Sequence, residues 1–200
     1  LALRNIGAAA KADSAVKNKL QQMVTQDAKA HVRESALSTL YKYFDDSTLD
    51  NIAINDSSYN VMTTALEHYI TKNPKQLSEL KKYESDNNNN LLYTLSGLYA
   101  QYGSDENYDY MINALNVASG FGKMGIIQNL GTFLEHSSPA VTEKGVDALT
   151  DAAKNSSSKF MNMQTSNTLS KLKKFVTNKI KELETKPEYF DQLSRYKKIE

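Results

Sequence analysis

The stretch "INDSSYNVMTTALEHY", Ile54 to Tyr69, places apolar side chains at regular intervals behind an aspartate. Counted from Asp56, the fifth, ninth and thirteenth residues are Val61, Ala65 and Tyr69. Residues at this spacing lie on one face of an α-helix, because about 3.6 residues complete each turn. The stretch therefore predicts a helix with one apolar face, preceded by an aspartate.

The same frame recurs along the chain. Further copies start at Asp27 and Asp86, and a fourth starts at Phe121 without the aspartate, so that successive copies are 29, 30 and 35 residues apart. Their apolar positions are Val32, Ala36 and Leu40, then Leu91, Leu95 and Tyr99, and finally Ile126, Leu130 and Leu134. A period near thirty residues, with one striped helix in each copy, indicates stacked pairs of helices. We expect the aliphatic residues of the stripe to be buried where helices meet.

Capping chemistry indicates where the companion helices start. Serine, aspartate and asparagine side chains accept hydrogen bonds from the free N–H groups of a first helical turn, and proline at the first helical position loses no bond. Residues of this kind are Asp13, Ser47, Asn73 before Pro74, Ser104, and Ser138 before Pro139. The predicted helix pairs cover residues 13–44, 47–72, 74–102, 105–135 and 138–184, and Leu1–Lys11 is expected to be the trailing helix of a truncated pair.

The predicted fold class is all-α, because no segment alternates with a period of two for long enough to form a strand. We expect an α-solenoid of about five antiparallel helix pairs, a HEAT/ARM-like superhelix, in a single domain spanning residues 1–200. Leu1 reads as the middle of a helix, so we also expect the domain to be part of a longer protein.

Composition excludes several classes of function. The formal net charge is +1 and there is no cysteine, so neither a general attraction to polyanions nor a disulfide or thiolate zinc site is expected. No apolar run reaches the length of a membrane-spanning helix. We expect a soluble chain without a cofactor of its own, and the sequence indicates no cellular compartment.

The spacing of Asp27, Val32 and Arg33 resembles the Asp-x4-Val-Arg that opens the second helix of HEAT repeats. The phrases "DAKAHVRESALSTLYKYF" (27–44) and "AINDSSYNVMTTALEHYITKNP" (53–74) are similar to the C-terminal helical repeat region of bacterial zinc aminopeptidases of the M1 (gluzincin) family. In that family the activity and the zinc belong to an upstream domain with Gly-x-Met-Glu-Asn and His-Glu-x-x-His motifs, and neither motif occurs here. The resemblance implies a noncatalytic domain that covers the active-site chamber and limits which peptides enter.

Candidate catalytic and metal-binding residues are few. His31, His68 and His136 stand alone, since no two histidines lie three or four residues apart. The segment "GFGKMG" (120–125) is a literal Gly-x-Gly-x-x-Gly, but a dinucleotide site needs a strand before it, and the preceding residues are helical in pattern. We interpret the segment as a turn with close helix packing, and we expect no catalytic, cofactor-binding or metal-binding residue in this chain.

The C-terminal stretch is basic. Residues 159–200 hold ten lysines and arginines against five acidic residues, a pattern that nucleic acid or an acidic partner could use. A helical apolar stripe runs through the same stretch, at Leu169, Leu172, Phe175, Val176, Ile180 and Leu183. The favoured interpretation is a core-facing helix with solvated lysines opposite, and we expect no nucleic-acid partner and no membrane partner.

The leading hypothesis is therefore an accessory domain of an M1-type zinc aminopeptidase, with the upstream catalytic domain of the same polypeptide and peptide substrates as its partners. Arg33, Tyr59 and Lys123 are the candidate substrate-binding residues, because they lie near the starts of second helices, which tend to face the chamber in related enzymes. The alternative is a freestanding HEAT-like scaffold that binds another protein. A third hypothesis, nucleic-acid binding or base-excision chemistry, rests on the basic C-terminal stretch alone.

Overall fold

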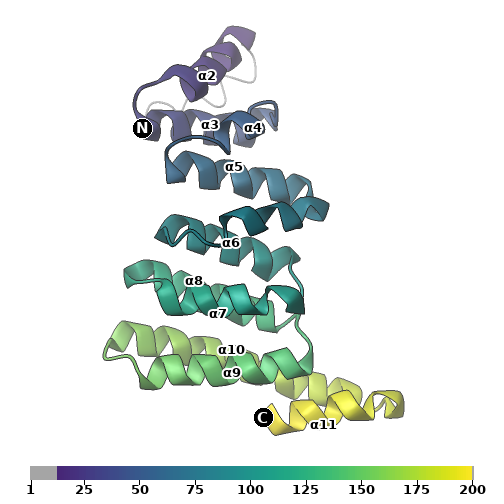
Figure 1. The fold of residues 1–200 in the computed structure, drawn as a ribbon. Coiled ribbons are helices and arrows are strands. Elements are labelled where there is room, and N and C mark those ends of the chain that lie inside the picture. The colour runs from purple at the N-terminus through teal and green to yellow at the C-terminus, as the bar shows by residue number, and fades with distance from the viewer. Residues whose placement is uncertain (1–12, 200) are drawn as a thin grey trace. The chain divides into compact units, whose positions relative to one another are not determined.

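The computed structural model describes residues 13–199, and every regular element in this range is helical. The α-helices are α2 (Ser14–Gln26), α3 (Ala30–Phe44), α4 (Asp50–Ala53), α5 (Tyr59–Lys72), α6 (Asn89–Tyr102), α7 (Tyr108–Val117), α8 (Gly120–Leu134), α9 (Pro139–Lys154), α10 (Lys159–Leu183) and α11 (Phe190–Ile199), and the 3₁₀ helices are η1 (Pro74–Tyr83), η2 (Asp105–Asn107) and η3 (Pro187–Tyr189) (Figure 1). The all-α prediction is confirmed. The helix expected at Leu1–Lys11 lies outside the described residues.

The chain divides into two compact units, with the division after Glu79. In the first unit, α2 packs against α3, α3 packs against α5, and the short α4 lies beside α5. Its core consists of Leu20, Val24, Ala36, Leu37, Leu40, Ala53, Ile54, Val61, Ala65, Leu66 and Ile70. The organisation as one domain stays a prediction.

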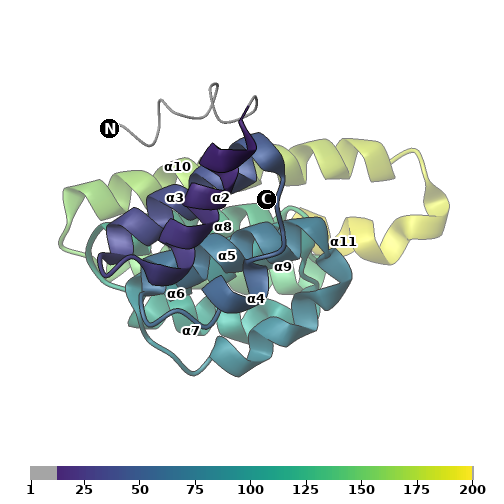
Figure 2. The same cartoon turned by 90° about the horizontal axis from the view of Figure 1, so that it is seen from above.

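In the second unit, α6, α8 and α10 follow one another, with α7 against α6 and α8, and α9 against α8 and α10 (Figure 1). After η3 the chain turns back, and α11 packs against α9 and the C-terminal half of α10 (Figure 2). Tyr196 of α11 joins Val176, Ile180 and Leu183 of α10 in a buried cluster. The last helix thereby covers apolar surface that α10 would otherwise expose.

The predicted apolar stripe forms much of both cores. All of its aliphatic positions are buried except Val32, which is half-buried in the first turn of α3. Tyr99 is buried and Tyr69 is half-buried. The burial prediction is therefore confirmed at every aliphatic position but one.

The recurrent aspartates form the turns that start the second helices. The side chains of Asp27, Asp56 and Asp86 each accept a hydrogen bond from the backbone N–H two residues ahead, at 2.8, 2.8 and 2.9 Å. In each case the helix begins three residues after the aspartate, at α3, α5 and α6. Such a side-chain turn holds the backbone at the angle from which the helix starts. The turn explains why the aspartate recurs at a fixed distance before the stripe.

The fourth copy of the frame starts one helical turn earlier than predicted. Since α8 begins at Gly120, the residue equivalent to the aspartates is Val117, four residues before Phe121. A shift of about one turn leaves the stripe on the same helical face, so Ile126 and Leu130 are buried as expected. Before α10, Ser156 takes the place of the aspartate, because its Oγ accepts from the N–H of Ser158 at 3.2 Å.

Ser47 does not start a helix, and Asn73 has a second role besides preceding the 3₁₀ helix η1 at Pro74. Asp46, not Ser47, forms the turn before α4 by accepting from the N–H and the hydroxyl of Thr48, and α4 starts only at Asp50. Asn73 closes the preceding helix, because its side-chain amide donates to the carbonyl of Tyr69 at 3.0 Å. Asp13 is confirmed as a cap: it accepts from the N–H of Ala15 at 2.8 Å. Pro139 occupies the first turn of α9, as proline is expected to do.

Candidate functional site

Arg33, a candidate substrate-binding residue, is engaged by groups of its own unit. Its Nε and Nη2 donate to the two carboxylate oxygens of Asp56 at 2.7 Å each, and its Nη1 donates to the carbonyl of Asp27 at 2.9 Å. The Arg33 and Asp56 side chains are only 14% and 12% exposed. The guanidinium, the largest influence on this carboxyl group, holds the pKa of Asp56 below its usual range. Arg33 thus joins the start of α3 to the turn that starts the next repeat.

We expect this bidentate pair to contribute measurably to stability. Replacing Arg33 with methionine should cost about 1–3 kcal/mol of unfolding free energy near neutral pH, because a half-buried carboxylate loses both charge-assisted bonds. The folded-state pKa of Asp56 is lowered, so the contribution is present above the ordinary aspartate pKa of about 3.9 and is lost as the pH falls through the lowered value.

The measurement is denaturant unfolding of both proteins at several pH values. Lys72→Met is the control, because Lys72 pairs with the exposed Asp45 and should matter less. Equal losses for the two variants, or a difference from the parent chain that persists undiminished in acid, would contradict the structural role of Arg33.

Tyr59 and Lys123 lie where the sequence places them, at the starts of α5 and α8. Tyr59 is half-buried, and its carbonyl accepts from the hydroxyl of Thr63 at 2.7 Å. Lys123 is half-buried in the second unit and makes no ion pair within residues 13–199. Arg33 and Tyr59 belong to the first unit, so neither unit contains all three candidate residues.

Lys123 lines an open groove of about 550 Å³ in the second unit. The groove lies where the end of α7 and the start of α8 meet the end of α9 and the start of α10, and Asn116, Asp151 and Asn155 also line it. Asp151 pairs weakly with Lys154 at 3.8 Å, while Lys123, which has no ion pair among residues 13–199, shares the groove lining with asparagine and serine side chains. Groups of this kind can bind a carboxylate.

A second polar cluster surrounds His68 in the first unit. The imidazole stacks on the Tyr41 ring, with centroids 3.6 Å apart and an angle of 4° between the planes. Its Nδ1 lies 3.2 Å from both oxygens of the buried Asp50, which also accepts the Tyr41 hydroxyl at 2.6 Å. Burial, and then the bond to Asp50, raise the pKa of Tyr41 well above its usual range.

This cluster has the components of a proton-transfer dyad without the access that catalysis requires. The Nε2 of His68 is buried and makes no hydrogen bond, and its nearest carboxylate oxygen is that of Asp45 at 3.6 Å. A general base must come within hydrogen-bond reach of a substrate proton. Because Nε2 is covered, the arrangement of His68, Asp50 and Tyr41 joins α3, α4 and α5 rather than presenting a reactive group.

Buried tyrosines form a comparable cluster in the second unit. Tyr99 donates its hydroxyl to Glu84 at 2.6 Å and meets Tyr110 edge to face, with ring centroids 5.2 Å apart. Burial, the largest influence in both cases, raises the pKa of Tyr99 and of Tyr110 well above the usual range. These hydroxyls therefore remain neutral and serve packing.

The glycine-rich segment belongs to α8. Gly120 starts the helix with a positive φ of 56°, a conformation that glycine adopts without strain. Gly122 faces Asn89 of α6, and Gly125 lies directly under the Tyr93 ring of the same helix. The expected close helix packing is confirmed, but the segment is not a turn, because the turn between α7 and α8 lies before it at Ala118 and Ser119. The preceding element is the helix α7, not the strand that a dinucleotide site needs.

Among residues 13–199, no group of three or more histidine, aspartate or glutamate side chains is arranged to hold a metal ion. His31 and His136 are exposed. Within the same range, no helix combines the length and the apolar character needed to cross a membrane.

Comparisons with known proteins found no matching family model, no similar curated protein and no similar solved structure.

Proposed function

We propose that this chain is a noncatalytic HEAT-like helical-repeat domain, the C-terminal part of an M1-type zinc aminopeptidase, and that its helix pairs form an α-solenoid. The observation that carries the repeat interpretation is the turn shared by Asp27, Asp56 and Asp86, which places each second helix at the same point of a period of about thirty residues. A solenoid suits a chamber wall, since small rotations from pair to pair produce a concave surface without special residues.

The link between Arg33 and Asp56 supports a stacked arrangement. Asp56 occupies the position in the following repeat that Asp27 occupies in the first. Arg33 therefore donates hydrogen bonds both to the turn of its own repeat, at Asp27, and to the turn of the next repeat, at Asp56. The two phrases that resemble the aminopeptidase tail form α3 and α5, the second helices on either side of this link. The resemblance and the ion pair thus concern the same pair of repeats.

Polar side chains that pair within their own units support a noncatalytic role. Arg33, His68 and Tyr99 all have their polar partners inside their own units, and these contacts stabilise packing. Lys123 differs, because it makes no ion pair in the described part of the chain and lines a groove. In the proposed enzyme it is the candidate best able to bind the C-terminal carboxylate of a peptide, while Arg33 acts mainly in structure.

The alternative function is a freestanding HEAT-like scaffold that binds another protein. The two proposals differ in what is encoded immediately upstream of Leu1. An upstream region with His-Glu-x-x-His and a distant glutamate ligand fits the aminopeptidase, since this set holds catalytic zinc. An upstream region without these ligands would overturn the proposal in favour of the scaffold.

The proposal predicts that the purified 200-residue chain neither retains zinc nor hydrolyses peptides. The reason is that zinc and its ligands belong to the proposed upstream domain. Metal analysis after dialysis and an aminopeptidase assay with amino-acid anilides test this. Stoichiometric zinc, or turnover that survives a second purification and is abolished by a chelator, would contradict a noncatalytic role.

A further inference from the structure

The outer face of α10 carries lysines and no acidic side chain over most of its length. The buried side of the helix includes Thr165, Leu172, Val176 and Ile180. On the opposite side, exposed to solvent, are Lys159, Phe160, Met163, Lys171, Lys174 and Lys181, with Lys173 exposed at the edge; we call these residues the lysine face. The first acidic residue of α10 is Glu182. The positive charges therefore gather on the C-terminal half of α10, at positions 171–181, and Lys159 adds one at the start of the helix.

The charges of this face are not neutralised by the described part of the chain. None of the lysines at positions 159, 171, 173, 174 and 181 makes an ion pair or a side-chain hydrogen bond among residues 13–199. Other lysines near the end of α10 are paired: Lys179 and Lys186 both contact Glu182, and Lys197 contacts Glu184. Five lysines without such partners thus lie on one helix.

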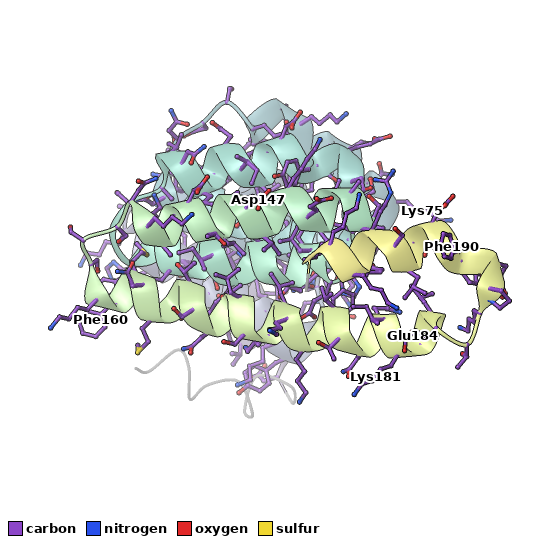
Figure 3. The ribbon with its side chains drawn as sticks, turned by 90° about the horizontal axis from the view of Figure 1, so that it is seen from below. Lys75, Asp147, Phe160, Lys181, Glu184 and Phe190 are labelled. Carbon is purple, nitrogen blue, oxygen red and sulfur yellow. The ribbon has the colours of Figure 1, made fainter. Side chains whose placement is uncertain are left out.

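Two large apolar side chains lie at one end of the same face. Phe160 is 67% exposed and Met163 is 54% exposed. Phe160 and Lys181 project from opposite ends of α10, away from α9 (Figure 3). The rise of an α-helix, about 1.5 Å per residue, makes the face about 33 Å long between its first and last lysine.

We propose that the lysine face of α10 docks on an anionic lipid surface, with the lysines at the headgroups and with Phe160 and Met163 in the interfacial layer. Clusters of four to eight basic residues on a helix bind anionic membranes, and phenylalanine adds affinity by entering the headgroup boundary. The inference departs from the sequence expectation of no membrane partner. It does not depend on the proposed peptidase function.

The shape and chemistry of the face favour lipid over nucleic acid. The lysines at positions 159, 171, 174 and 181 are exposed on the outer side of one helix, so they can meet a plane together. The face contains no arginine, the residue best suited to bidentate contacts with phosphates and bases. Phe160 is its only aromatic residue, too few for the stacking that single-stranded nucleic acids use.

The test is flotation of the 200-residue chain with vesicles at about 0.1 M salt. Vesicles of phosphatidylcholine containing about 30% phosphatidylglycerol should bind the chain, and vesicles of phosphatidylcholine alone should not. The triple variant Lys171→Gln, Lys174→Gln, Lys181→Gln should bind about a hundredfold more weakly, since each lysine contributes about fivefold. Phe160→Ser, made alone, should also weaken binding to the anionic vesicles, and it should leave the salt dependence of binding unchanged.

The matched control is Lys75→Gln, Lys81→Gln, Lys144→Gln, which removes the same charge from exposed positions outside α10. It should bind the anionic vesicles within about threefold of the unmodified chain. Circular dichroism of both triple variants verifies that they are folded. Equal losses in the two variants, absence of binding to the anionic vesicles, or tighter binding to a short DNA duplex than to the vesicles would each overturn the proposal.

Discussion

Replacing Leu130 with alanine should lower the free energy of unfolding by about 2–5 kcal/mol. Leu130 is fully buried in α8, the helix that packs against α6, α7, α9 and α10. Truncation removes apolar surface from the core and leaves a cavity among well-packed neighbours, and both effects destabilise. Urea unfolding followed by circular dichroism measures the change.

The control for this variant is Gln128→Ala, an exposed position on the same helix. It should change stability by no more than about 0.5 kcal/mol, because surface substitutions away from special features have small effects. If Leu130→Ala changed stability as little as Gln128→Ala, the central place of α8 in the second unit would be wrong.

Substituting Gly145 with alanine should cost about 1–3 kcal/mol, although alanine is the better helix former. A methyl group at this position in α9 would overlap the side chain of Leu134 in α8. Leu134 is fully buried and cannot swing into solvent, so the helices must separate or the leucine must leave its rotamer. The loss should appear as a lower midpoint in both thermal and urea unfolding.

Gly122 in α8 provides the matched control. A methyl group there would meet only the side chain of Asn89, at an ordinary contact distance of 3.7 Å. Gly122→Ala should therefore be neutral or should stabilise the chain by up to about 1 kcal/mol through helix propensity. Two Gly→Ala changes with effects of the same sign and size would contradict the close contact of α8 and α9.

The helix pairs and the stripe could be predicted because a helix that buries one face repeats its apolar residues with the helical period. The length of the first helix in each predicted pair could not be predicted in the same way. Between Phe44 and the turn at Asp56, the helix that forms is the four-residue α4. The segment that begins at Pro74 forms a 3₁₀ helix instead of an α-helix. Tertiary packing decides such short elements, and their local sequence carries little periodicity.

The last helix was not predicted, although the sequence contains a signal for it. Pro187 is suited to a first helical turn, and Leu193, Tyr196 and Ile199 recur at intervals of three. These three side chains pack against the end of α10, which explains why the apolar stripe of α10 continues to Leu183. A stripe that extends beyond its neighbours indicates that another element covers it.

The role of Arg33 in the structure differs from its predicted role because its main contact crosses from one repeat to the next. The sequence identifies Arg33 as a cation at a helix start, but its partner Asp56 is 23 residues away and belongs to the next repeat. A period of 29 residues places the two turns in neighbouring repeats, so the pair could have been inferred from the repeat itself. The cluster of Tyr41, Asp50 and His68 follows no repeated spacing, and only the packing of three helices brings it together.

The most direct measurement of the proposed role compares the proposed aminopeptidase that contains this chain with a version of it that lacks residues 1–200. The quantity to measure is kcat/KM for a series of peptides that share their first residues and differ in length. We expect deletion to change the dependence of kcat/KM on peptide length while the catalytic domain keeps its zinc, because a chamber wall acts on the far end of the substrate. An unchanged length dependence in a folded, zinc-loaded deletion variant would contradict the account.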